Sequence, residues 1–247
     1  MPSWIPACLL APFIGSFLGV VVLRHDAGGS VLTGRSACRA CKIVLSAWDL
    51  VPVLSWVWLR ARCRHCGAAI GLFYPSMEVA ALLVVLWAAW AAGGALFWVS
   101  CGLGWALLAL AVTDIKYYRL PDFLTLPLIV AGLLVNAILD SATLWHYGLG
   151  AAAGYLFIHG LRFIYQRLRG REGMGAGDAK LLAAAGAWVS WWGLPSVIVI
   201  GSLLGLAAAL AMSWRGGRIG WSDRVPFGAF LAMGLWIVWL YGPLTAG

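Results

Sequence analysis

The chain has 247 residues, of which 63% are hydrophobic and 11% are charged, and its mean hydropathy is +0.91. A soluble domain is nearer half apolar and a quarter charged, so this composition excludes an ordinary soluble protein and indicates a polytopic membrane protein. The net charge of +8 would suit a nucleic-acid partner. Whether the charge indicates such a partner depends on where the basic residues lie in the sequence.

Eight stretches of the chain are apolar and long enough to cross a bilayer, which takes about 20 residues as a helix. Helices are expected because lipid leaves backbone polar groups no other partner. The first stretch lacks a preceding basic segment and a small-residue cleavage site, so it is predicted to be a transmembrane helix and not a cleaved signal peptide. The fifth is interrupted by two histidines and an arginine, and the sixth is short. The stretches are approximately 5–23, 74–93, 95–113, 123–140, 144–164, 179–193, 195–213 and 226–244.

All 17 Lys and Arg lie on one side of this eight-helix arrangement, in the connections or near the span ends that adjoin them. The positive-inside rule makes that side cytoplasmic and places both termini outside. The charge is therefore interpreted as a topology signal, with a small contribution from anionic lipid. No nucleic-acid partner is predicted. The predicted fold is an all-α polytopic membrane protein with a first helix at 1–23, a cytoplasmic loop at 24–73 and a seven-helix core at 74–247.

The cytoplasmic loop carries two Cys-x-x-Cys pairs separated by 21 residues: Cys38, Cys41, Cys63 and Cys66. This spacing is typical of a four-cysteine zinc site, in which each pair binds one ion from a tight turn. A cytoplasmic location keeps thiols reduced and favours metal over disulfides. Such a site is closed and structural, because four protein ligands leave no position for substrate. Iron–sulfur ligation and metal-free thiols remain the alternatives.

Asp114 ends the third predicted span, and Asp178 begins the sixth. A carboxylate at a membrane boundary is costly and is a functional candidate. The helix macrodipole disfavours Asp114 at a C-terminal end, and an ion pair with Lys116 or Arg119 would be its structural explanation. Two such aspartates, separated by two crossings, could share one proton as in an aspartic protease.

Residues near the two aspartates have predicted supporting roles. Asp122 follows Pro121 and suits the start of a helix. Three alternating glycines (Gly173, Gly175 and Gly177) precede Asp178 and permit a sharp bend or the close approach of another backbone. A P-loop or dinucleotide site would need flanking residues that are absent. Lys180 is expected to pair with Asp178, to anchor at the interface, or to do both, and Asp178 itself could merely cap its helix.

At this point the motifs resemble those of the type IV prepilin leader peptidases, membrane aspartic proteases of the GxGD kind. The resemblance runs through the whole chain in order: Gly15-Ser16-Phe17-Leu18 with Arg24, the two cysteine pairs with Ser36 and Gly67, Tyr74-Pro75-x-x-Glu78, Asp114 with Leu120-Pro121-Asp122 and Leu126-Pro127, Gly175-x-Gly177-Asp178-x-Lys180, and Pro226-Phe227-Gly228.

The resemblance implies that Asp114 and Asp178 are the catalytic pair. It also implies that the enzyme cleaves after a glycine, between the basic leader and the hydrophobic helix of a type IV prepilin or type II secretion pseudopilin. The implied location is the bacterial inner membrane, with catalytic loops facing the cytoplasm. One aspartate activates water and the other donates a proton, and the pair titrates as a unit.

Many members of this family also methylate the new N-terminus with S-adenosylmethionine. The cysteine loop and Glu78 make this second activity an expectation here, with Glu78 as the candidate residue. Two positions depart from the family pattern: Gly19 stands where the family has Asn, and Asp49-Leu50-Val51-Pro52 stands for Asp-Asn-Ile-Pro.

Two other classes of protein use the same features differently. A transporter would relay protons or ions through the aspartates, but would need polar residues continuing across the membrane. The confident spans are instead almost purely Ala, Leu, Val, Trp and Gly. A zinc-bearing membrane scaffold would leave the glycines around Asp178 unexplained.

Overall fold

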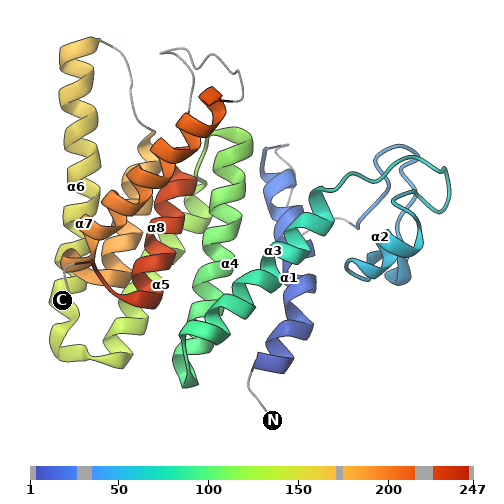
Figure 1. Cartoon of the computed structure of the whole chain (residues 1–247), viewed down its shortest axis with the longest axis horizontal. Coiled ribbons are helices and arrows are strands. Elements are labelled where there is room, and N and C mark those ends of the chain that lie inside the picture. Colours follow the sequence, from blue (N-terminus) through green and yellow to red (C-terminus); the bar gives the residue numbers. More distant parts are fainter. Residues whose placement is uncertain (1–3, 27–34, 171–174, 215–224, 245–247) are drawn as a thin grey trace. The chain divides into compact units, whose positions relative to one another are not determined.

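The computed structural model describes residues 4–26, 35–170, 175–214 and 225–244 (Figure 1). It divides into two compact units, 1–105 and 106–247, and the boundary lies within one helix. Each unit is considered by itself. The helices, including two 3₁₀ turns, are α1 (Trp4–Asp26), η1 (Ala47–Leu50), α2 (Leu54–Trp58), α3 (Phe73–Ala91), α4 (Gly94–Tyr117), α5 (Asp122–Leu139), η2 (Ser141–Thr143), α6 (Leu144–Arg169), α7 (Ala176–Trp214) and α8 (Phe227–Tyr241).

The described residues form helices over every predicted span. Five helices are long and apolar enough to cross a membrane: α1, α3, α4, α5 and α7. Helix α8 is apolar but has only 15 residues, and α6 contains the polar residues that interrupt the fifth predicted span. In the described part of the chain the only β pairing consists of two isolated bridges in the cysteine loop. The all-α prediction is confirmed.

In the first unit, α1 and α3 pack with their backbones nearly in contact. A Cβ at Gly15 would clash with the Met77 carbonyl oxygen and the Glu78 backbone. Small residues permit such approach in membranes, where dispersion and hydrogen bonds replace the hydrophobic drive between helices. Trp105 at the end of this unit donates a hydrogen bond from Nε1 to the Ala81 carbonyl, at 3.1 Å. The α1–α3 pair supports the cysteine loop that joins them.

In the second unit, helix α7 is a hairpin of two helical segments. Its 39 residues would extend about 58 Å if straight, roughly twice the hydrocarbon thickness. Ser190 interrupts it with a φ of 60° and a ψ of 179°. Before this break Asp178 lies near Gly228 and Trp188 packs on Trp239, so the first segment runs parallel to α8.

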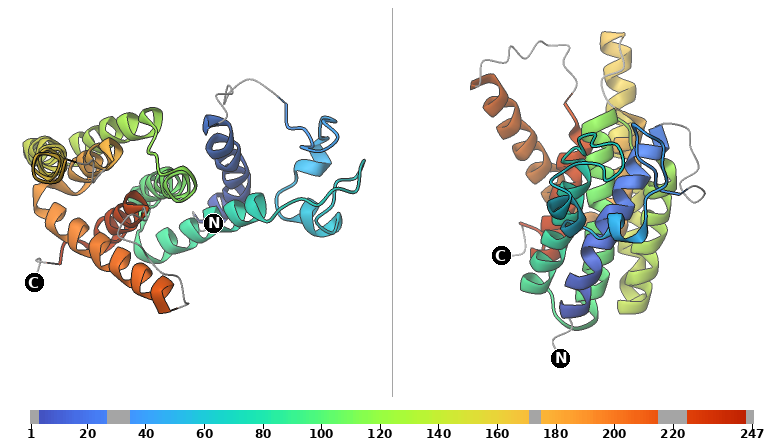
Figure 2. Two further views of the ribbon diagram at one scale, coloured as in Figure 1. Left: turned by 90° about the horizontal axis from the view of Figure 1, so that it is seen from above. Right: turned by 90° about the vertical axis from the view of Figure 1, so that its right-hand side faces the viewer.

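After the break the direction is reversed. Val197 lies against Gly234, whereas Gly201, four residues later, lies against Leu231. The second segment is therefore antiparallel to α8, and the left view of Figure 2 shows the two segments of α7 meeting at an angle. The two crossings predicted at 179–193 and 195–213 are thus present within α7, with the reversal at Ser190.

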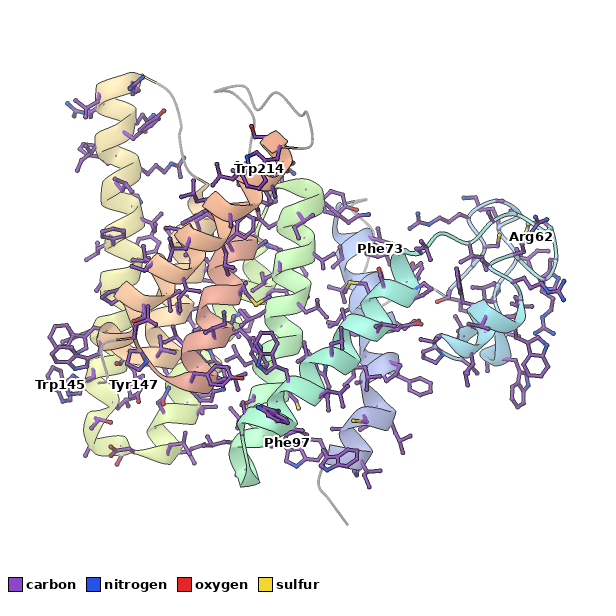
Figure 3. All side chains as sticks on the ribbon, viewed as in Figure 1. Arg62, Phe73, Phe97, Trp145, Tyr147 and Trp214 are labelled. Atoms are coloured by element: carbon purple, nitrogen blue, oxygen red, sulfur yellow. The ribbon has the colours of Figure 1, made fainter. Side chains whose placement is uncertain are left out.

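Exposed tryptophans mark both ends of the second unit. Figure 3 shows Trp214 at the end of α7 and Trp145 at the start of α6, at opposite ends of this unit, and both side chains are exposed. Trp is enriched where a membrane protein meets the two lipid–water boundaries. The last turns of α4 and α6 and the first turns of α5, α7 and α8 lie at the Trp214 end. Residues 171–174 and 215–224, including Gly173 and four of the basic residues that carried the topology prediction, lie outside the described residues.

The break in α7 leaves backbone carbonyls that need hydrogen-bond donors, and the side chain of Asn136 in α5 is such a donor. Its buried amide nitrogen donates to the carbonyls of Ala187 and Trp188, at 3.1 and 3.4 Å, and to its own Gly132 carbonyl at 2.9 Å. Carbonyls near a helix end have no intrahelical partner, and lipid offers none. Asn136 therefore stabilises the hairpin from a neighbouring helix.

Replacing Asn136 with leucine is expected to destabilise the protein because the two α7 carbonyls lose their donor. A buried group left unsatisfied costs about 1–3 kcal/mol, which lowers the melting temperature by several degrees at this chain length. The measurement is the temperature at which purified protein in detergent loses monodispersity. Leu134→Ala, which alters an exposed side chain of the same helix, is the matched control. Equal melting temperatures for Asn136→Leu and wild type would refute the assignment.

Candidate active site and metal centre

Asp114 occupies the last turn of α4. The helix ends because Tyr118 adopts a φ of 53°, with its amide bonded to the Asp114 carbonyl at 2.8 Å. The Asp114 side chain is only 6% exposed. It accepts a hydrogen bond from the Ala229 amide, which lies 3.0 Å from Oδ2, and a further one from the Gly228 amide. Asp114 therefore points toward the first turn of α8.

Asp178 occupies the first turn of α7 and is 9% exposed. Its carboxylate accepts a hydrogen bond from the Gly175 amide. Gly175 and Gly177 both belong to the motif that singled out Asp178. A Cβ on Gly177 would lie 2.7 Å from the Leu120 Cβ, so this glycine permits the close approach of the α4–α5 connection.

The two aspartates meet at Gly228. A Cβ built on Gly228 would lie 3.0 Å from Oδ2 of Asp114 and 3.1 Å from Oδ1 of Asp178. These oxygens can therefore be no further apart than about 6 Å, a range over which two carboxylates influence each other's ionisation. Three helix ends that are remote in sequence thus bring two buried carboxylates to one small space. A general acid and a general base can act there on the same peptide bond.

Lys180 and Asp122 form an ion pair next to the aspartates. Nζ of Lys180 contacts Oδ1 of Asp122, with the two side chains 28% and 59% exposed. The pair joins the first turn of α7 to the first turn of α5. The structure pairs Lys180 with Asp122 and not with Asp178, the partner expected from the sequence, because the start of α5 lies beside the start of α7.

Sequence reasoning missed that the α8 amides and Leu120 contribute to this site. Leu120 and Gly228 lie in motifs that the family resemblance used, and the position of Gly228 at the start of the last predicted helix was the available signal. A contact with two aspartates from other helices leaves no local pattern, since it depends on the tertiary arrangement.

The four loop cysteines form one cluster. Their sulfurs all lie within 4.8 Å of one another, and those of Cys38 and Cys66 are 3.8 Å apart. A tetrahedral ion with metal–sulfur bonds of about 2.3 Å separates its ligands by about 3.8 Å, whereas a disulfide separates sulfurs by about 2 Å. The cluster could hold a metal ion.

Both cysteine pairs have the same backbone conformation. The Lys42 amide donates to the Cys38 carbonyl at 2.9 Å, and the Gly67 amide donates to the Cys63 carbonyl at 2.9 Å. Each of these donors follows the second cysteine of its pair and has positive φ, 61° for Lys42 and 70° for Gly67. Glycine adopts this conformation without strain. The similar turns of the two cysteine pairs therefore direct all four sulfurs toward one position.

The protonation of the cluster also suits a cation. The Cys41 and Ala40 amides donate to the Cys38 sulfur and lower its pKa to about 6. The Ala68 amide favours the thiolate of Cys66, but desolvation and hydrogen bonds with the other sulfurs outweigh it and raise its pKa to about 11. A divalent metal stabilises all four thiolates at once.

Two carboxylates attach this loop to its surroundings. Asp49, whose side chain is 4% exposed, accepts from Nε of Arg64 at 2.9 Å and from the Ser46 hydroxyl at 2.7 Å. These hydrogen bonds, with Ser46 the largest contributor, keep the pKa of Asp49 low despite its desolvation. Arg64 lies inside the second cysteine pair, so Asp49 joins η1 to the cluster.

Glu78 is buried near the start of α3 and accepts a hydrogen bond from the Val53 amide at 2.7 Å. The Ser16 hydroxyl of α1 also donates to it. Val53 has a φ of 59°, which is strained for a β-branched residue. Glu78 thus connects the loop to both helices that support it.

Two family models match the chain. A model described as the bacterial peptidase A24 N-terminal domain covers residues 9–92, and one described as the type IV leader peptidase family covers residues 101–210. The aspartates that meet at Gly228 both fall within the second match. No solved structure matches the chain.

Curated relatives match nearly the whole chain, and three of them are named prepilin leader peptidase/N-methyltransferase. The protein from Burkholderia pseudomallei is 42% identical over 255 residues, covering 92% of this chain and 82% of the relative. Those from Aeromonas salmonicida and Pseudomonas aeruginosa are 37% and 34% identical, each alignment covering 95% of this chain and 89% of the relative. The chain therefore belongs to the type IV leader peptidase family.

Proposed function

We propose that the chain is a membrane aspartic endopeptidase that removes the basic leader from type IV prepilins or type II secretion pseudopilins. The observation that carries the proposal is the meeting of Asp114 and Asp178 at Gly228 in a chain whose relatives are named prepilin leader peptidases. Family membership also favours a peptidase over a transporter that uses the same two aspartates.

The proposed reaction uses the aspartates as one acid–base pair. Two carboxylates so close do not both ionise readily, so one holds a proton. The ionised aspartate takes a proton from water, and the resulting hydroxide attacks the carbonyl carbon of the substrate glycine. The protonated aspartate donates to the carbonyl oxygen, and the pair later returns a proton to the leaving amine. Burial of both side chains strengthens these interactions.

The proposed location is the cytoplasmic face of the bacterial inner membrane. Lys116, Arg119, Arg167 and Arg169 lie in or beside the connections at the aspartate end of the second unit, as the positive-inside rule expects of a cytoplasmic end. An unprocessed prepilin keeps its basic leader on that side. The bond to be cut, between leader and hydrophobic helix, would then reach the membrane boundary where the aspartates lie.

Asp114→Asn and Asp178→Asn are each expected to reduce prepilin cleavage at least about 100-fold, the lower end of what a positioned acid or base contributes. Asparagine keeps the shape of the side chain but cannot exchange the proton. Cleavage is measured with full-length prepilin in membranes containing equal amounts of each variant. Asp140→Asn, at the opposite end of α5, is the control and should retain activity. Full cleavage by either aspartate variant would exclude the dyad.

We also propose that Cys38, Cys41, Cys63 and Cys66 bind zinc in a closed, structural site. A four-thiolate tetrahedron is the donor set that zinc favours, and all four positions are taken by protein. The loop would be held around the ion by the two cysteine turns. The links through Asp49 and Glu78 would add to this support.

Purified protein is expected to contain about one zinc per chain, and Cys38→Ser or Cys66→Ser should reduce this below about 0.2. Elemental analysis gives the ratio. Cys101→Ala removes a buried thiol outside the cluster and should leave the zinc content unchanged. Visible absorption with stoichiometric iron would instead identify an iron–sulfur centre, and neither metal in wild type would exclude the site.

We further propose that the enzyme methylates the new N-terminus with S-adenosylmethionine, as the names of its relatives describe for those proteins. Glu78 remains the candidate residue for this second activity. Its bonds to Val53 and Ser16 also give it a structural role. The structural role needs only an oxygen that accepts hydrogen bonds, which the amide of a glutamine also provides. A role in methyl transfer that depends on the negative charge would be lost with glutamine.

If its charge acts in methyl transfer, Glu78→Gln is expected to lower that activity at least about tenfold while cleavage is retained. The measurement is transfer of labelled methyl from S-adenosylmethionine to cleaved pilin, beside cleavage of the same sample. Glu78→Ala, which also removes the acceptor for Val53, separates the charge from the structural link. Unchanged methylation in Glu78→Gln would leave Glu78 with the structural role alone.

A further inference from the structure

The first turn of α8 lies against both proposed catalytic aspartates. Pro226 precedes the helix, and Phe227, Gly228 and Ala229 form its first turn. Amides at this position have no intrahelical acceptor. Two of them, from Gly228 and Ala229, donate to the Asp114 carboxylate. An aspartate from α4 thus performs at α8 the task that a capping side chain usually performs from the same chain segment.

The surroundings of Gly228 differ from those of the other glycines in this unit. Gly150, Gly154 and Gly234 face the backbone of a neighbouring helix, where absence of a side chain permits close packing. A Cβ on Gly228 would instead lie 3.0 and 3.1 Å from the carboxylate oxygens of Asp114 and Asp178. Among the glycines that the structure describes, Gly228 is the one whose Cβ would contact both aspartates.

The methyl group of an alanine at this position would be 3.0 and 3.1 Å from the two carboxylate oxygens, closer than ordinary contact, so the carboxylates would have to move. Such a shift matters because the attacking water and the scissile carbonyl each exchange a proton with one aspartate at hydrogen-bond distance. Helix propensity alone would favour alanine over glycine here. The glycine is therefore explained better by the close approach of the two carboxylates that it permits than by the helix that it begins.

We propose that the first turn of α8 is the third component of the catalytic centre. Its amides orient Asp114, and Gly228 is a positioning residue whose lack of a side chain lets both carboxylates lie against the start of α8. The inference rests on the proposed peptidase function and adds a residue to that site. It assigns a role in the reaction to Pro226-Phe227-Gly228, which the sequence alone had marked only as a motif.

Leu120 offers a way to separate this role from simple packing. Its Cδ1 would be 2.8 Å from a Cβ on Gly228, closer than either carboxylate oxygen. If Gly228→Ala acts only by crowding this side chain, shortening Leu120 to alanine should restore activity. If the methyl group acts on the aspartates, the double variant should remain impaired.

The experiment measures kcat and KM for cleavage of a prepilin by purified wild type, Gly228→Ala, Leu120→Ala and the double variant. Gly228→Ala is expected to lower kcat at least about tenfold with KM changed less than about threefold, because displaced carboxylates impair the chemical step more than the binding of the leader. The double variant should be equally impaired. Gly205→Ala, whose Cβ meets only the Phe230 ring of the same helix pair, is the packing control and should cleave normally.

Three outcomes would overturn the inference: wild-type kcat in Gly228→Ala, recovery of kcat in the double variant, or an effect confined to KM. If Gly228→Ala does not accumulate as folded protein, the double variant removes its closest contact and provides the measurement. Cleavage by wild type in the same series tests the peptidase proposal separately. An inactive wild type refutes that proposal, whereas an active wild type with an active Gly228→Ala refutes only the role of α8.

Discussion

A polar group that leaves water inside a bilayer must find its partner within the protein, and the second unit is organised around that requirement. The break in α7 frees carbonyls, which Asn136 of α5 satisfies. The start of α8 leaves amides, two of which donate to Asp114. In both places one helix end is completed by a side chain from another helix. The same contacts that satisfy the backbone therefore also determine which helices lie together.

The arrangement of the second unit also requires close approach between helix backbones, which glycine permits at several positions. Gly150 and Gly154 allow α6 to contact α7, and Gly234 allows α8 to contact the second α7 segment. These contacts place the start of α8 beside the starts of α5 and α7. At the start of α8, Gly228 instead lets two side chains, the carboxylates of Asp114 and Asp178, lie against the helix backbone. Glycine thus permits both the packing of the helices and the close approach of the two aspartates.

The sequence predicted the features that depend on local composition and spacing. Apolar length predicted the helices, the spacing of the cysteines predicted a four-sulfur cluster, and two aspartates at membrane boundaries predicted a meeting point at one end. The reversal within α7 was predicted as a short connection, although its position at Ser190 was not. The partners of Asn136, Lys180 and Asp114 could not be predicted. Each joins residues more than 50 positions apart, and their polar side chains carry no pattern that names the partner.

The two aspartates have unequal surroundings, and this bears on how a substrate is admitted. Asp114 is held by amides of another helix, whereas Asp178 is held by Gly175, three residues before it in the chain. The Asp114 side of the site therefore depends on how α4 and α8 pack, and the Asp178 side depends on Gly175 just before α7. A local contact can adjust without moving two packed helices. Adjustment to a substrate is then expected at Gly175 and Asp178, while the α4–α8 contact keeps the other carboxylate in position.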